Sequence, residues 1–169
     1  MKKLNENIKL GIFEGVSALL AILSLVFTFL PAYFEDGRSD MSIINIMMGD
    51  ERISSSPLLI FGFVLLVLGI VVTIILTILH FLNKSNELIT TILGIASVVL
   101  VLAGGIILTC AVFIQGLDKL NSELGLVQGS WGFKIGNFLV PIFALVSVGF
   151  SYPSALIIPH HKDVAEKQK

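Results

Sequence analysis

Four long apolar runs dominate the chain and constrain its fold more than any other feature. The runs cover roughly residues 10–31, 58–82, 88–114 and 135–158. An α-helix rises about 1.5 Å per residue, so about 20 apolar residues cross a hydrocarbon core of roughly 30 Å. The mean hydropathy is +0.95 and only 14% of the residues are charged, whereas soluble domains carry about a quarter. The sequence therefore predicts an integral membrane protein with four spans.

The residues between the spans are too few for a second domain. They form the tails 1–9 and 159–169, the loops 32–57 and 115–133, and a very short turn between the second and third spans. We therefore expect one membrane domain over residues 1–169. Its fold class would be all-α, an antiparallel up-down-up-down bundle of four transmembrane helices.

The positions of the basic residues predict the orientation of this bundle. Seven of the eleven Lys and Arg residues lie in the two tails and in the turn at Lys84. Cytoplasmic segments carry an excess of Lys and Arg. We therefore expect both termini on the cytoplasmic side (N-in/C-in) and the loops 32–57 and 115–133 outside.

Small residues recur along one face of each predicted helix. Because lipid tails are as apolar as leucine, such residues allow transmembrane helices to approach closely. Their spacing is near 3.5 residues, which predicts left-handed crossings of about 20°. Whether these seams pack within the chain or between copies remains open at this point. The predicted seams contain Gly11, Ser17, Ala21, Ser24, Gly69, Ser97, Gly104, Ala111 and Ala144.

Two ionisable residues, Glu14 and His80, interrupt the spans near their cytoplasmic ends. Antiparallel passage places them at a similar depth, in one layer with Thr77, Thr91, Ser151 and Tyr152. One interpretation is a proton- or ion-responsive site or a polar binding niche, because an intramembrane charge is costly without a partner. The other is a buried link that fixes helix register, or a glutamate that reaches the interface.

The first outer loop contains a short apolar stretch, residues 41–48. It fits an amphipathic helix at the membrane interface, a strand, or a flap over the bundle. Its candidate interaction residues are Ile43, Ile44, Met47 and Met48. In the second outer loop, Trp131 and Phe133 fit an aromatic belt.

Motifs that carry chemistry are absent from the sequence. It has no glycine-rich phosphate loop, no Cys/His set with metal-ligand spacing and no supported nucleophile–base set. A bundle with one buried acid and one histidine is a poor candidate for an enzyme. We expect no enzymatic activity, no cofactor, no metal and no nucleic-acid partner.

The layout resembles small four-span bacterial membrane proteins of unassigned function. The resemblance rests on the Leu30-Pro31 end of the first span, the stretch Ser42–Gly49 and the run Trp131–Gly136. The topology is also similar to the claudin-like tetraspan group. The first outer loop lacks the tryptophans and cysteines of the claudin signature, so no claudin binding residue carries over. The bacterial resemblance implies a plasma-membrane location.

Two functions follow as hypotheses. The first is a non-enzymatic assembly or accessory subunit that contacts itself or other membrane proteins, as well as the lipid bilayer, through its helix seams and first outer loop. The second is a small channel or transporter subunit whose path would lie between protomers, with a cytoplasmic-side polar site at Glu14 and His80 as its gate. The middle of the second and third spans is mainly Val, Ile, Leu and Gly, which favours the first hypothesis.

Overall fold

The computed structural model describes residues 2–35, 40–49, 54–82, 84, 86–115 and 131–152. Its four long helices are α1 (Lys2–Phe27), α3 (Pro57–Phe81), α4 (Glu87–Thr109) and α7 (Ile135–Tyr152). Two shorter helices are α2 (Ile43–Met48) and α5 (Ala111–Ile114). The strands are β1 (Pro31–Glu35), β2 (Met41–Ser42) and β3 (Trp131–Phe133).

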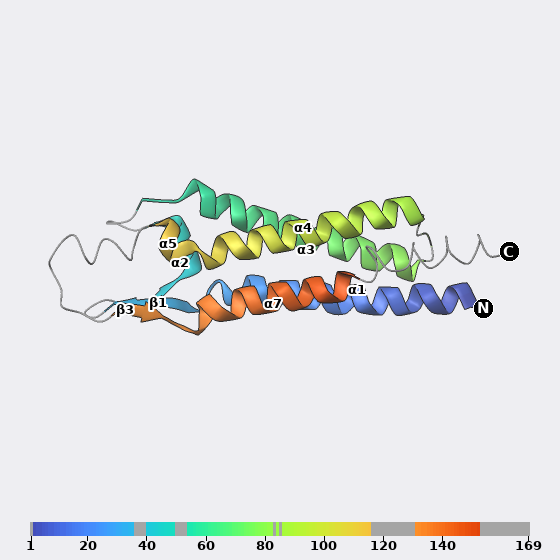
Figure 1. Cartoon of the computed structure of the whole chain (residues 1–169), viewed down its shortest axis with the longest axis horizontal. Coiled ribbons are helices and arrows are strands. Elements are labelled where there is room, and N and C mark those ends of the chain that lie inside the picture. Colours follow the sequence, from blue (N-terminus) through green and yellow to red (C-terminus); the bar gives the residue numbers. More distant parts are fainter. Residues whose placement is uncertain are drawn as a thin grey trace.

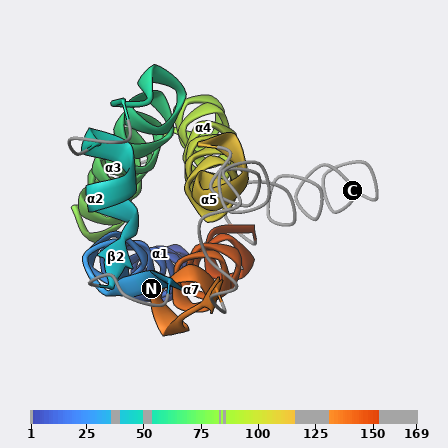
Figure 2. The same cartoon turned by 90° about the vertical axis from the view of Figure 1, so that its left-hand side faces the viewer.

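The long helices lie side by side, as Figure 1 shows. Viewed along their axes, α1 packs on α3 and α7, and α4 packs on the same two helices (Figure 2). The strands, α2 and α5 gather at one end, which we call the sheet end. The start of α1 and the α3–α4 turn at Lys84 lie at the opposite end, which we call the hairpin end.

Three helices are long and apolar enough to cross a membrane: Asn7–Phe27, Pro57–Phe81 and Leu88–Thr109. The apolar part of α7, Ile135–Ser151, is shorter. Large apolar side chains point outward from all four helices, such as Leu19, Phe61, Val99 and Leu145, which are 54–63% exposed. The described part of the chain is therefore predominantly helical and has three helices that could span a membrane, whereas the sequence predicts four spans.

The helix ends have local causes. Beyond Phe27, the amides of Thr28, Phe29 and Leu30 bond to carbonyls three residues back, and Pro31 then opens β1. The side chain of Ser56 caps the start of α3 by accepting from the amide of Leu59, with Pro57 in the first turn as expected.

Two predicted spans differ from the structure. The predicted span 10–31 corresponds to α1, which begins at Lys2 and ends at Phe27, and Pro31 already belongs to β1. The predicted span 88–114 breaks at Cys110, where α4 ends and α5 begins. There the Thr109 hydroxyl donates to the Gly105 carbonyl, and such side-chain bonds compete with the helical ladder. The last part of the predicted fourth span, 153–158, lies outside the described residues.

A small sheet at the sheet end was not predicted, so the all-α assignment is incomplete. Its strand order is β2-β1-β3, and all pairs are antiparallel. Tyr33 pairs with Phe133, which ties the end of the first long helix to the start of the last. Strands of five, two and three residues are too short to show a clear alternation of apolar and polar residues.

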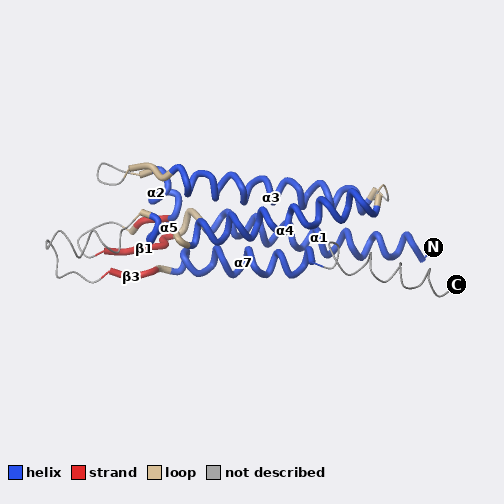
Figure 3. The backbone as a smooth tube through the Cα atoms, turned by 45° about the horizontal axis from the view of Figure 1, so that its top comes forward, coloured by secondary structure: helices blue, strands red, loops and turns tan. Residues whose placement is uncertain are grey.

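Residues 41–48, for which the sequence left a helix, a strand and a flap open, form β2 and the short helix α2 at the sheet end (Figure 3). The Ser42 side chain accepts from the Asn45 amide and caps α2, and Gly49 ends the helix with a φ of 78°. Ile43, Ile46 and Met47 are buried. They join the apolar core and fill the sheet end of the bundle.

Candidate functional site

A cluster of hydroxyl groups joins α1 to α7 in the hairpin half of the bundle. Ser17 Oγ donates to the Ser147 carbonyl at 2.9 Å, and Ser147 Oγ donates to the Ser17 carbonyl at 2.9 Å. Ser17 Oγ also lies 2.7 Å from Ser151 Oγ. Nearer the sheet end, Ser24 Oγ donates to the Val140 carbonyl at 2.8 Å. Hydrogen bonds between helices are a recognised source of association in lipid.

Glu14 completes this cluster and is fully buried. Ser151 Oγ donates to Glu14 Oε2 at 3.0 Å. Gly11 and Gly15 of α1 face α3, where they lie against His80 and Thr77. Glu14 lies three residues from both Gly11 and Ser17, about 60° around the helix from each. Its side chain therefore points between α3 and α7, toward the interior. We call Glu14, Ser17, Ser147 and Ser151 the hydroxyl cluster.

Glycines join α3 to α4 in a different way. A Cβ atom on Gly104 would lie 2.6 Å from the Leu66 amide nitrogen and 2.8 Å from the Gly62 carbonyl oxygen. A Cβ on Gly69 would lie 2.9 Å from the Val101 amide nitrogen. These distances are too short for any larger residue, so the two backbones touch. On the other side of α4, Gly105 lies equally close to Ala144 of α7.

His80 lies at the hairpin end of this glycine-packed pair and is 2% exposed. Gly69 of α3 lies against Val101 of α4. His80 follows Gly69 by eleven residues and Thr90 precedes Val101 by eleven. Because the two helices are antiparallel, His80 and Thr90 lie opposite each other. Eleven residues are just over three full turns, so both residues stay on the facing sides of their helices. Both side chains are buried, and among the described residues neither His80 Nδ1 nor Thr90 Oγ1 has a hydrogen-bond partner.

The other predicted site residues are placed as follows. Thr77 is half-buried, and its hydroxyl donates to the Thr73 carbonyl of its own helix. The side chain of Tyr152 lies outside the described part. Glu14 and His80 come from adjacent helices at neighbouring levels, because Gly11, one turn before Glu14, lies against His80. The hydrogen bond from Ser151 reaches Glu14 from α7, on the other side.

Every predicted seam residue is buried. Ser17 and Ser24 face α7. Gly11 faces α3, Gly69 of α3 faces α4, and Gly104 of α4 faces α3. Of the predicted interaction residues, Ile43 and Met47 are buried, Ile44 is half-buried and Met48 is 63% exposed. The predicted seams and most of the predicted interaction loop therefore serve contacts within the chain.

Sequence reasoning overlooked Ser147 and gave Thr90 no role beyond packing. Ser147 lies three residues after Ala144 and four before Ser151, so the spacing rule for the seams could have identified it. Thr90 was placed on a seam, but its position opposite His80 depends on the contact between Gly69 and Val101.

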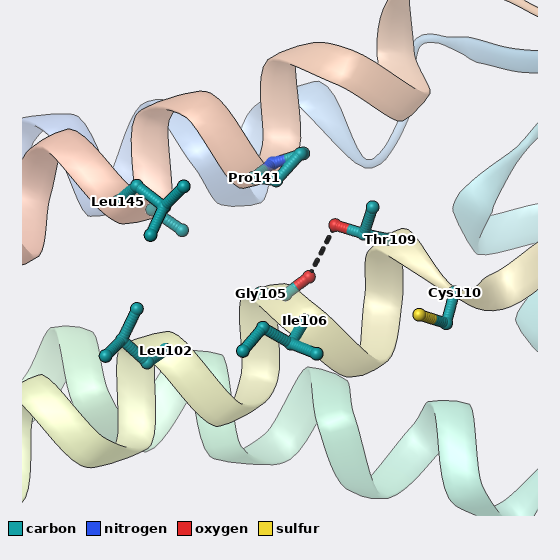
Figure 4. A pocket seen from close by; sticks show the side chains of 8 residues that line it. Leu102, Gly105, Ile106, Thr109, Cys110, Pro141 and Leu145 are labelled. Atoms are coloured by element: carbon teal, nitrogen blue, oxygen red, sulfur yellow. Dashed lines mark hydrogen bonds between the residues drawn. The ribbon is translucent and has the colours of Figure 1, made fainter.

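A groove of about 130 Å³ lies between α4 and α7 (Figure 4). Apolar side chains line most of it, and its polar lining atom, the Thr109 hydroxyl, bonds to the Gly105 carbonyl. Pro141, inside α7, faces α4 across the groove. The groove thus adds no polar group that could hold a charged ligand.

The described residues contain no group of three or more His, Cys, Asp or Glu side chains that could hold a metal ion. Comparison of the chain with protein families, with characterised proteins and with solved structures finds no match. The resemblance to claudin-like and small bacterial four-span proteins therefore stays a prediction. The functional argument rests on the geometry of this chain alone.

Proposed function

We propose that the chain crosses a bacterial plasma membrane four times, with α7 as the fourth passage. The 18 residues of α7 extend about 27 Å, close to the hydrocarbon thickness. The helix packs along both α1 and α4, which are long enough to cross. The excess of Lys in the tails favours the hairpin end, and hence both termini, in the cytoplasm. A left-handed bundle would follow from the seam spacing.

We further propose that the protein acts as a non-enzymatic assembly or accessory subunit. The observation that carries this proposal is closure of the sheet end. Fully buried Ile43 and Ile46 of α2 fill it together with Leu59, Ala111 and Val112. We call residues 41–48 the cap. Two hydrogen bonds hold it to the bundle: the Ile44 amide donates to the Thr28 carbonyl, and the Gln115 side chain donates to the Ile46 carbonyl.

This closure bears on how partners would bind. Since the glycine and serine seams are occupied within the chain, a second copy or another membrane protein would meet the outward-facing walls and the exposed rim of the cap. The walls carry large apolar side chains such as Phe61, Val64 and Val99. At the rim, Met48 is exposed and Lys134 forms an ion pair with Asp40.

The alternative, a channel or transporter subunit, has less support from the geometry. A conduction path needs polar groups at every depth, but Leu66, Ile70 and Val101 form the buried middle of α3 and α4. The buried polar groups of these two helices, Thr73, His80, Thr90 and Ser97, are confined to the hairpin half. A polar niche at the hairpin end is compatible with this arrangement, whereas a continuous polar path between α3 and α4 is not.

Site-specific photo-crosslinking in intact membranes tests the proposal. A photoreactive residue would replace Phe61, Val99, Leu145 or Met48, all exposed. We expect a discrete protein adduct from at least one of these positions. A matched probe at buried Leu76 should give none, because no partner can reach it.

Two results would contradict the proposal. One is that all four exposed positions crosslink to lipid alone while the purified protein runs as a monomer in mild detergent. The other is saturable ion flux in proteoliposomes that the Glu14→Gln substitution abolishes while Ile46 is unchanged. That result would favour the transport alternative.

A further inference from the structure

Two buried polar atoms at the hairpin end lack hydrogen-bond partners among the described residues, and helix geometry places their residues on the facing sides of α3 and α4. His80 Nδ1 and Thr90 Oγ1 form no hydrogen bond with a described residue, and their side chains are 2% and 8% exposed. The Leu76 backbone, one turn back along α3, interacts with the imidazole, although His80 Nδ1 forms no hydrogen bond of ordinary geometry with a described residue. Leaving a buried polar atom without a hydrogen bond is unfavourable. Two such atoms on facing helices indicate a place that a ligand occupies.

The charge of the surroundings indicates the kind of ligand. Among the acidic and basic side chains that the structure describes, Glu14 and His80 are the buried ones. Lys9 and Lys84 are exposed. Glu14 points to the interior from α1, one turn deeper than His80, and Ser151 of α7 donates to it. A carboxylate in the membrane interior favours a cation nearby.

The donor set distinguishes between cations. Ca²⁺ and Mg²⁺ prefer cages of oxygen ligands, and transition metals need several imidazole, thiolate or carboxylate ligands, a grouping that is absent from the described residues. An imidazole nitrogen with a free lone pair and a threonine hydroxyl are instead good acceptors for N–H donors. With the Glu14 carboxylate one turn away, they match a group that carries both a positive charge and several N–H bonds.

We propose that Glu14, His80, Thr90 and Ser151 form a binding site for a small ammonium group, either ammonium itself or a primary amine. The Glu14 carboxylate would supply the charge. His80 Nδ1 and Thr90 Oγ1 would accept hydrogen bonds, with the histidine proton on Nε2. Ser151 holds the carboxylate in place from α7. The site draws one residue from each long helix, so binding would tie all four together at the hairpin end.

Thermal unfolding of the full chain in detergent micelles tests the proposal with methylammonium chloride as the probe. Anything that binds only the folded state raises its unfolding temperature in a saturable way. We expect such a rise with methylammonium at pH 7. Sodium chloride at equal ionic strength should give none, and tetramethylammonium, which has no N–H bond, should give none either. An equal rise with all three salts would overturn the proposal.

Two variants locate the effect. Thr90→Val keeps the shape and removes one acceptor, so the apparent methylammonium affinity should fall roughly tenfold, the range for a hydrogen bond to a charged group. Glu14→Gln should abolish the response. Ser24→Ala, which removes a hydroxyl bonded nearer the sheet end, should leave the affinity unchanged even where it lowers the starting temperature.

The variants also give outcomes that reject the site. An unchanged affinity in Thr90→Val, or a response retained in Glu14→Gln, would place binding elsewhere. If Glu14→Gln does not fold, calorimetric titration of Thr90→Val and wild type with methylammonium decides the matter alone. Neither result bears on the proposed assembly role, which rests on the closed sheet end and is tested by crosslinking.

Discussion

The two halves of the bundle are held together by different means. In the α3–α4 pair, Gly69 and Gly104 bring the backbones into direct contact. In the α1–α7 pair, Ser17, Ser147 and Ser151 link the helices through side-chain hydroxyls. Lipid offers no hydrophobic force to press helices together, so both pairs rely on packing and hydrogen bonds. We therefore expect that a larger side chain at the α3–α4 contact disrupts the packing as a whole. Removing a hydroxyl from the α1–α7 contact should reduce stability only by the hydrogen bonds lost.

The largest expected effect is that of Gly104→Leu. The added side chain would meet the Leu66 and Gly62 backbones, which cannot rotate away. We expect a loss of more than about 3 kcal/mol in stability, at or beyond the usual range for overpacking. Circular dichroism during heating in detergent measures it.

The control for this variant is Gly149→Leu on α7. No atom lies within 4 Å of a Cβ built at Gly149, so the added side chain enters open space. Its midpoint should equal or slightly exceed that of wild type, because glycine is a poor helix former. Equal losses for the two variants would show that the backbone contact does not hold α3 to α4.

A smaller loss is expected from Ser17→Ala. The change removes the hydroxyl that contacts both Ser147 and Ser151 and leaves buried partners unsatisfied. We expect a loss of about 1–2 kcal/mol, measured in the same way. A loss as large as that of Gly104→Leu would contradict the distinction between the two pairs.

Double variants sharpen the comparison further. Ser17→Ala and Ser147→Ala remove members of one network, so their combined loss should be smaller than the two losses added together. Ser17→Ala and Gly104→Ala affect different helix pairs, and their losses should add within about 0.5 kcal/mol. Strong coupling in the second combination would mean that the pairs do not act separately.

The smallest expected effect is that of Thr73→Val. Thr73 is fully buried like Ser17, but its hydroxyl donates to the Gly69 carbonyl of its own helix. That carbonyl can keep its bond within the helix after the change, and valine fills the same space. We expect a change within about 0.5 kcal/mol, the range of mutations away from sensitive features. A loss of stability as large as that of Ser17→Ala would show that a buried hydroxyl contributes equally whether it bonds to its own helix or to a neighbouring one.

The sequence predicted the parts of this fold that depend on local composition. The second span was expected at residues 58–82 and is observed as Pro57–Phe81, because its apolar run, its proline and its capping serine are all adjacent in the chain. The burial of Gly104 and Ser17 follows from the same periodic pattern.

What the sequence could not predict depends on which helices are neighbours and how they rotate. The pairing of Tyr33 with Phe133 joins segments a hundred residues apart, and no local pattern encodes it. Glu14 and His80 could be assigned a common depth from the spans. The bond from Ser151 to Glu14 and the position of Thr90 opposite His80 required the helix contacts themselves.

Cysteine labelling across the membrane tests the central claim, a four-pass protein with the sheet end outside, most directly. In a Cys110→Ser background, the exposed positions Ser55 and Lys84 would each be replaced by cysteine, with epitope tags on both termini. The account predicts that Ser55→Cys reacts with an impermeant reagent in intact cells, and that Lys84→Cys and both tags become accessible only after permeabilisation. Labelling of both cysteines from one side, or tags on opposite sides, would contradict it.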